Sequence, residues 1–78
     1  MRKERKALID LRVDILKKMD NFIRTEIDDE YIFYNMWLAE GVPDEASIED
    51  LIFIAEDEDN WDDVMRCFRN CCRLARVI

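Results

Sequence analysis

The fold is decided by residues 3–25, KERKALIDLRVDILKKMDNFIRT. Apolar side chains recur there every three or four residues, which is the spacing of one helix face, and the opposite face is polar. We predict one long helix, about 35 Å in length at a rise of 1.5 Å per residue. Its apolar stripe comprises Leu8, Leu11, Ile15, Met19 and Phe22, widened by Ile9, Val13, Leu16 and Ile23.

A second helix is predicted over about 29–40. Asp28 or Asp29 supplies its N-cap, because a short carboxylate accepts hydrogen bonds from the free amides of the first turn. Gly41 and Pro43 follow its end, in the order that typically terminates a helix. Residues 31–34, YIFY, are also typical of a strand, but the signals at both ends favour a helix.

Two further helices are predicted in the second half of the chain. One spans about 48–57, where Ser47 followed by Asp50 resembles a capping box. The last begins near Trp61, with Asn60 or Asp59 as its cap, and runs to the C-terminus. One face of this last helix carries Trp61, Val64, Met65, Phe68, Cys71, Cys72 and Ala75.

These segments leave only short connections, so we predict an all-α fold: a compact bundle of about four helices, the first being the longest. The chain of 78 residues forms a single domain, 1–78. A chain of this size buries only roughly 60% of the surface that it exposes when unfolded. Its length and its single glycine exclude a βαβ nucleotide-binding unit or a repeat array.

The composition points to a reducing compartment and to no membrane span. Asp10, Arg12 and Asp14 interrupt the segment after the basic N-terminus, so no signal-peptide core is present. The cysteines are Cys67, Cys71 and Cys72, an odd and clustered set that is a poor disulfide framework. We therefore expect a cytoplasmic protein with reduced thiols that pack as small apolar groups.

Enzymatic, metal and cofactor functions are not expected. The chain has no histidine, so a serine or cysteine nucleophile would lack its ordinary base. Residues 56–63, EDEDNWDD, look superficially like a calcium loop but have no glycine at the sixth position. Cys67 and Cys71 are spaced as zinc ligands, yet a single chain offers no histidine to complete the site.

The most informative pattern is the division of charge along the chain, whose net charge is −7. Residues 1–25 contain eight bases and four acids, residues 26–63 contain fifteen acids and no base, and residues 64–78 contain four arginines and no acid. One interpretation is that the basic end segments fold over and pair with the acids. Even then, an excess of carboxylates must face solvent or a basic partner.

The other interpretation is a binding surface. Carboxylates arranged like a row of phosphates can occupy the basic channel of a nucleic-acid enzyme, with fast association through charge steering. The protein would then act as a DNA mimic that binds a basic protein surface and not nucleic acid or a membrane. The predicted partner-binding residues are Asp28, Asp29, Glu30, Asp44, Glu45, Glu49, Asp50, Glu56, Asp57, Glu58, Asp59, Asp62 and Asp63, with Trp37 and Trp61 as aromatic anchors at the rim.

In size and charge, the chain resembles the small acidic inhibitors that phages make against host nucleases and CRISPR effectors. Residues 37–51, WLAEGVPDEASIEDL, are similar to a stretch of small phage or prophage accessory proteins. The resemblance implies an anti-CRISPR-like or DNA-mimic inhibitor. It covers under a fifth of the chain and carries no catalytic residue.

An alternative from another class is a structural homo-oligomer whose acids only aid solubility. Residues 31–38 and 51–55 are apolar almost all round, which is more than one helix face of a small bundle requires. Either these segments lie centrally or part of them forms an interface. A symmetric homodimer is the commonest form of such self-association.

Overall fold

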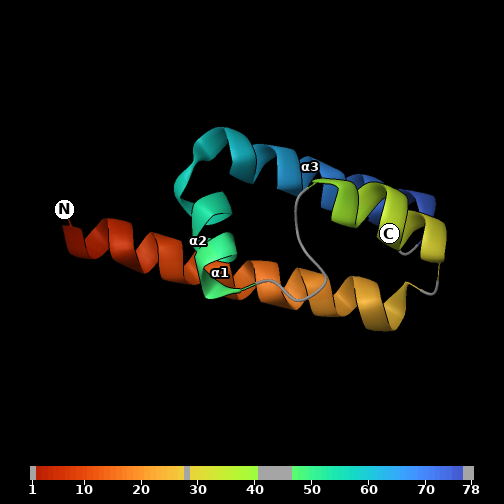
Figure 1. Cartoon of the computed structure of the whole chain (residues 1–78), viewed down its shortest axis with the longest axis horizontal. Helices are drawn as coiled ribbons and strands as arrows, with labels where there is room; N and C mark the ends of the chain where they lie inside the picture. The colour runs from red at the N-terminus through yellow and green to blue at the C-terminus, as the bar shows by residue number, and fades with distance from the viewer. Residues whose placement is uncertain (1, 28, 41–46, 77–78) are drawn as a thin grey trace.

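The computed structural model describes residues 2–27, 29–40 and 47–76 (Figure 1). Within these ranges the chain is helical and contains no strand, which confirms the predicted all-α fold and the first helix as the longest. The molecule measures 40 × 23 × 19 Å. In Figure 1, α1 (Arg2–Glu26) forms one layer and α3 (Glu58–Leu74) the other, while α2 (Ile48–Glu56) crosses between them.

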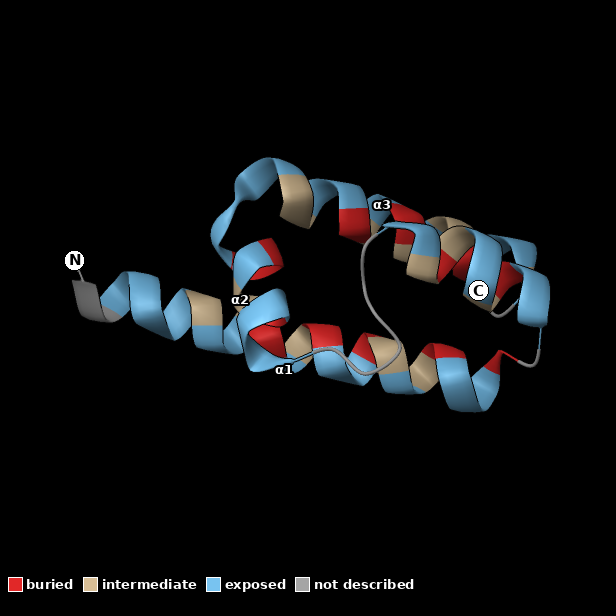
Figure 2. Cartoon of the chain, in the orientation of Figure 1, coloured by how far each residue is buried: buried red, intermediate tan, exposed pale blue. Residues whose placement is uncertain are grey.

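Helix α1 agrees with the predicted span, but its buried face is displaced from the predicted one. The buried side chains are Val13, Leu16, Met19 and Ile23, continued by Ile27 after the helix. The prediction that Leu8 and Leu11 lie in the stripe facing the core is wrong, since both are exposed. Figure 2 shows that the N-terminal end of α1 extends past the other helices and is mostly exposed, and Leu8 and Leu11 keep 41% and 56% of their surface exposed.

The second predicted helix is present with a different backbone geometry. It consists of the π-helix η1 (Ile32–Trp37) and the 3-10 helix η2 (Leu38–Glu40). Asp29 caps it, because its Oδ1 accepts hydrogen bonds from the backbone amides of Tyr31 at 2.9 Å and Ile32 at 3.3 Å. The other predicted signals, Asp28, Gly41 and Pro43, lie outside the described residues.

The π-helical geometry follows from the two side chains that this segment buries. Ile32 and Trp37 are five residues apart, and both are buried. An α-helix turns 100° per residue and would set them about 140° apart around its axis. Hydrogen bonding from residue i+5 to residue i widens the turn, as Leu38 N–H does to Phe33 O. The wider turn lets both side chains face the core.

Helices α2 and α3 are joined by a single residue. Ser47 caps α2 as predicted, since its Oγ accepts from Asp50 N at 3.2 Å. The predicted start of the last helix near Trp61 is wrong, because α3 begins at Glu58. Its cap is Asp57, whose Oδ1 accepts from Asn60 N at 3.0 Å. In a run of consecutive acids, the residue with extended backbone becomes the cap, and Asp57 has φ −109° and ψ 122°.

The core between the two layers is built around Trp37. Its ring lies edge-on to Phe68 of α3 at 5.9 Å, and Phe68 in turn meets Phe22 of α1 at 6.0 Å. The indole N–H donates to Asp20 Oδ1 at 2.9 Å, which satisfies the one polar atom of the buried ring. Trp37 therefore ties η1 to both α1 and α3.

The end of α3 contains a backbone conformation that favours glycine. Arg76 has a φ of 59°, in the left-handed region, and its amide bonds to Arg73 O at 3.1 Å. Helices commonly end this way with a glycine, which has no Cβ to clash. We expect Arg76→Gly to raise the free energy of unfolding by about 0.5–1 kcal/mol. Urea denaturation measures this change, and Arg73→Gly, inside the helix, should instead lower stability by about 1 kcal/mol.

Candidate functional site

Among the described residues, the largest set of exposed carboxylates lies on α2 and α3. We name it the α2–α3 acidic surface. Each of its carboxylates is exposed, so none is used to fill the core. The set begins in the first turn of α2, continues through the single-residue turn and ends in the second turn of α3. It comprises Glu49, Asp50, Glu56, Asp57, Glu58, Asp59, Asp62 and Asp63.

Ion pairs compensate little of this surface. Among the described residues, Arg12–Glu58 is the ion pair that joins two helices, with Nη1 and Oε1 at 2.8 Å. Asp63 pairs with Arg66 of the same helix at 3.3 Å, and the pairs Asp14–Lys18 and Asp20–Arg24 lie within α1. Pairing between the basic end segments and the central acids is therefore confined, in these ranges, to one junction.

Arg12 forms that junction. Packing of α1 on the core places its side chain at the turn between α2 and α3. Its Nη1 donates to Ala55 O at 3.0 Å and to Glu58 Oε1, and its Nη2 donates to Glu58 Oε2 at 3.1 Å. The guanidinium also lies 4.9 Å from the centre of the Trp61 ring. Arg5 donates to Glu56 O at 3.0 Å. Two bases of α1 thus satisfy the last carbonyls of α2.

The Arg12–Glu58 pair predicts a pH dependence of stability. Hydrogen bonds from Arg12 hold the pKa of the Glu58 carboxyl below its ordinary value of 4.5. A lowered folded-state pKa stabilises the fold above the unfolded-state pKa, and this stabilisation is lost as pH falls through the folded-state value. We expect Glu58→Gln to be less stable than wild type at neutral pH. The difference should disappear well below pH 4.5 in urea unfolding measured across pH.

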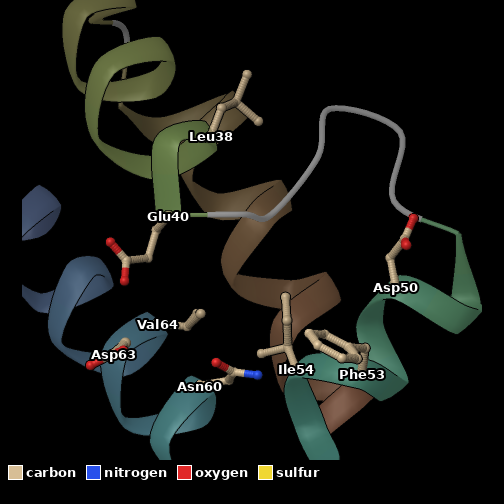
Figure 3. A pocket seen from close by; sticks show the side chains of 8 residues that line it. All are labelled: Leu38, Glu40, Asp50, Phe53, Ile54, Asn60, Asp63 and Val64. Carbon is tan, nitrogen blue, oxygen red and sulfur yellow. The ribbon is translucent and has the colours of Figure 1, made fainter.

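A groove lies beside the acidic surface, between η2, α2 and α3 (Figure 3). It encloses about 400 Å³. Its apolar lining includes Phe53, of which 65% is exposed, and its polar lining includes three carboxylates and no base. The residues that line it are Leu38, Glu40, Asp50, Phe53, Ile54, Asn60, Asp63 and Val64.

The predicted aromatic anchors have separate outcomes. The prediction that Trp37 lies at a rim is wrong, because the side chain is fully buried and belongs to the core. Trp61 is half-buried beneath Arg12. The available sequence signal is Asp20 itself, an acid placed at helical spacing between the apolar Leu16 and Ile23, where its carboxylate can accept the hydrogen bond of a buried indole N–H.

The predicted carboxylates fall into four groups. Glu30, Glu49, Glu56, Asp59 and Asp62 are exposed and take part in no ion pair with another described residue. Asp29, Asp50 and Asp57 serve local capping, while Glu58 and Asp63 have arginine partners. Asp28, Asp44 and Glu45 lie outside the described residues.

Sequence reasoning did not identify Phe53 as a site residue. Residues 51–55 are a continuous apolar run, and an unbroken run does not indicate which of its members is turned away from the core. The structure buries Leu51, Ile54 and Ala55 and leaves Phe53 exposed at the groove. The acids Asp50 and Asp57 do not distinguish the two residues, because they flank the buried Ile54 at the same spacings as the exposed Phe53.

The three cysteines pack in the core. Cys67 donates its S–H to Met36 O at 3.3 Å, and its sulfur lies 4.0 Å from that of Cys71. Burial, and then the neighbouring Cys71, raises the pKa of Cys67 to about 12, and burial also raises the pKa of Cys71 and Cys72. In the part of the chain that the structure describes, no group of three Cys, Asp or Glu side chains gathers to hold a metal ion.

This burial predicts slow thiol chemistry. The thiolate is the reactive form, and a raised pKa together with lack of access leaves little of it at mild pH. We expect an aromatic disulfide reagent to label the folded protein at least about 100-fold more slowly than the protein in denaturant. Absorbance of the released thiolate measures both rates. Labelling of the native protein at the denatured rate would contradict the buried arrangement.

Comparison of the chain with models of protein families, with curated proteins and with solved structures finds no match. None of the helices in the described ranges combines the length and apolar character required to cross a bilayer.

Proposed function

We propose that this protein is a small acidic interaction protein that binds a basic surface of another protein. The partner class that fits best is a nucleic-acid-binding enzyme, which the protein would inhibit by occupying the channel for phosphates. The small phage inhibitors that the chain resembles in size and charge act in this way, as anti-CRISPR or DNA-mimic proteins. No catalytic step is part of the proposal.

The observation that carries the proposal is the lack of internal neutralisation on the α2–α3 acidic surface. Of its eight carboxylates, only that of Glu58 forms an ion pair with a described base from a different helix. Exposed like charges repel one another and weaken the fold, so their concentration on two short helices favours an external role. A basic partner would relieve this repulsion and would be steered to the surface at long range.

The direct test is capture of partners from a host extract on two immobilised baits. One is the wild-type protein, and the other carries lysines in place of Glu49, Glu56, Asp59 and Asp62. The proposal expects a basic protein that the wild-type bait alone retains and that either salt or double-stranded DNA releases. Equal retention by the two baits, or resistance to both eluents, would contradict it.

A second candidate function, self-assembly, is favoured by a different observation. Leu8 and Leu11 lie one turn apart on the exposed end of α1, at 41% and 56% exposure. Exposed neighbouring leucines are typical of helix-packing interfaces. Sedimentation of the wild-type protein and of Leu8→Lys with Leu11→Lys distinguishes the candidates. A salt-insensitive oligomer that the double variant dissociates would support self-assembly, and a monomer in both would exclude it.

A further inference from the structure

The groove between η2, α2 and α3 has an apolar floor and an open volume large enough for a side chain of another molecule. Leu38, Phe53, Ile54 and Val64 contribute its apolar lining, and Phe53 presents most of its ring to solvent. Figure 3 shows the side chains of Phe53, Ile54 and Val64 directed into the space between α2 and α3. Its volume of about 400 Å³ falls within the range of small-ligand pockets, about 300–1000 Å³.

The charged residues that line the groove are all acidic. Glu40 and Asp63 lie to one side of the opening and Asp50 to the other (Figure 3). Glu40 and Asp63 also border a second hollow of about 250 Å³, so they form a ridge between two depressions. Arg66, which pairs with Asp63, lines the second hollow and not the first. An occupant of the groove therefore meets carboxylates on both sides of an apolar floor.

We infer that this groove is an anchoring site for a segment of the partner protein in which a bulky apolar side chain is flanked by lysine or arginine. The apolar side chain would pack on the accessible Phe53 and Leu38, above the buried Ile54 and Val64, while the flanking cations would reach Glu40, Asp63 and Asp50. The inference rests on the proposed function, since it names the part of the acidic surface that discriminates between basic partners. Charge alone would attract many basic proteins, whereas an apolar anchor selects among them.

The charge of the chain's own apolar surface favours a partner segment over a second copy. The exposed leucines of α1 share their face with Glu4, which lies one turn before Leu8. Docking that face in the groove would bring a carboxylate against the acidic rim. The neighbouring arginines are already engaged, since Arg5 bonds to Glu56 O and Arg12 bonds to Ala55 O and Glu58.

The test uses two synthetic peptides as probes. One has two central leucines flanked on each side by lysine and arginine, and the other has serines in place of the leucines. We expect the leucine peptide to bind the wild-type protein at least about tenfold more tightly, with shifts of the methyl resonances of Ile54 and Val64 in NMR titrations. Binding of both peptides should weaken as salt is raised.

Matched variants locate the site. Phe53→Ser removes an exposed ring from the groove and should abolish the preference for the leucine peptide. Tyr31→Ser removes a similarly exposed ring at the N-cap of η1, outside the groove, and should preserve the preference. Glu40→Gln with Asp63→Asn should weaken both peptides. The control Glu26→Gln with Glu30→Gln makes the same change of charge away from the groove. Thermal melting confirms that each variant is folded before its affinity is compared.

Each outcome decides the inference separately from the proposed function. Equal binding of the two peptides, or a leucine preference that survives Phe53→Ser, would contradict the groove as an anchoring site. Salt-sensitive binding to the acidic surface would still stand. Failure of the leucine peptide to bind would also overturn the inferred anchoring site, while capture of a basic protein would still support the proposed function. A dimer that Phe53→Ser converts to a monomer and that the leucine peptide disrupts would assign the groove to a second copy.

Discussion

Replacing Trp37 with alanine is expected to remove a large share of the protein's free energy of unfolding. The side chain is fully buried, packs edge-on to Phe68 and bonds to Asp20. Truncating a buried tryptophan to alanine costs about 3–5 kcal/mol. A domain of this length has a total stability of about 4–12 kcal/mol, from roughly 0.05–0.15 kcal/mol per residue. Far-ultraviolet circular dichroism and urea titration measure the loss.

Two further variants separate volume from hydrogen bonding at this position. Trp37→Phe keeps much of the ring but removes the N–H donor to Asp20, which retains its bond from Arg24. We expect an intermediate loss of about 1–3 kcal/mol. Tyr34→Ala removes an exposed ring of the same π-helix and should change stability by no more than about 0.5 kcal/mol. Equal stability of Trp37→Ala and Tyr34→Ala would contradict the central role of Trp37.

Reversing four charges on the α2–α3 acidic surface is expected to weaken binding of the captured partner at least about 100-fold. The changes are Glu49→Lys, Glu56→Lys, Asp59→Lys and Asp62→Lys, which move the net charge from −7 to +1. These four neither cap a helix nor pair with a described base, so the fold should survive. Asp57 and Glu58 are left unchanged because they hold the turn between α2 and α3. Surface plasmon resonance measures the affinities.

The control for this variant makes the same change of net charge on the first helix. Glu4→Lys, Asp10→Lys, Asp14→Lys and Glu26→Lys alter exposed carboxylates of α1. If position matters, this control should weaken binding far less than the variant of α2 and α3. Equal losses in the two variants would mean that net charge alone, and not the acidic surface, determines affinity.

The sequence was sufficient for the helices whose signals are local. The periodic stripe of α1 and the Ser47 cap of α2 lie within a few residues of the structures that they specify. The start of α3 was misplaced because four consecutive acids from Glu56 to Asp59 offer several equivalent caps. Only the backbone geometry at Asp57 decides among them.

The features that escaped prediction depend on contacts between distant segments. The π-helical turn of η1 arises because Ile32 and Trp37 must both reach a core whose walls are α1 and α3. The sequence around Arg12 does not indicate its role, because its partners Ala55 and Glu58 lie far away along the chain. The groove at Phe53 likewise needs Leu38 and Val64 from other elements. Local patterns carry no information about such pairings.

The most direct test of the acidic surface as a binding site is the affinity of the isolated partner across a series of salt concentrations, with and without double-stranded DNA. We predict a dissociation constant that rises steeply with salt, a shallower rise for the variant reversed at Glu49, Glu56, Asp59 and Asp62, and competition by DNA. An affinity that is insensitive to salt, unchanged by the four reversals and indifferent to DNA would contradict the account.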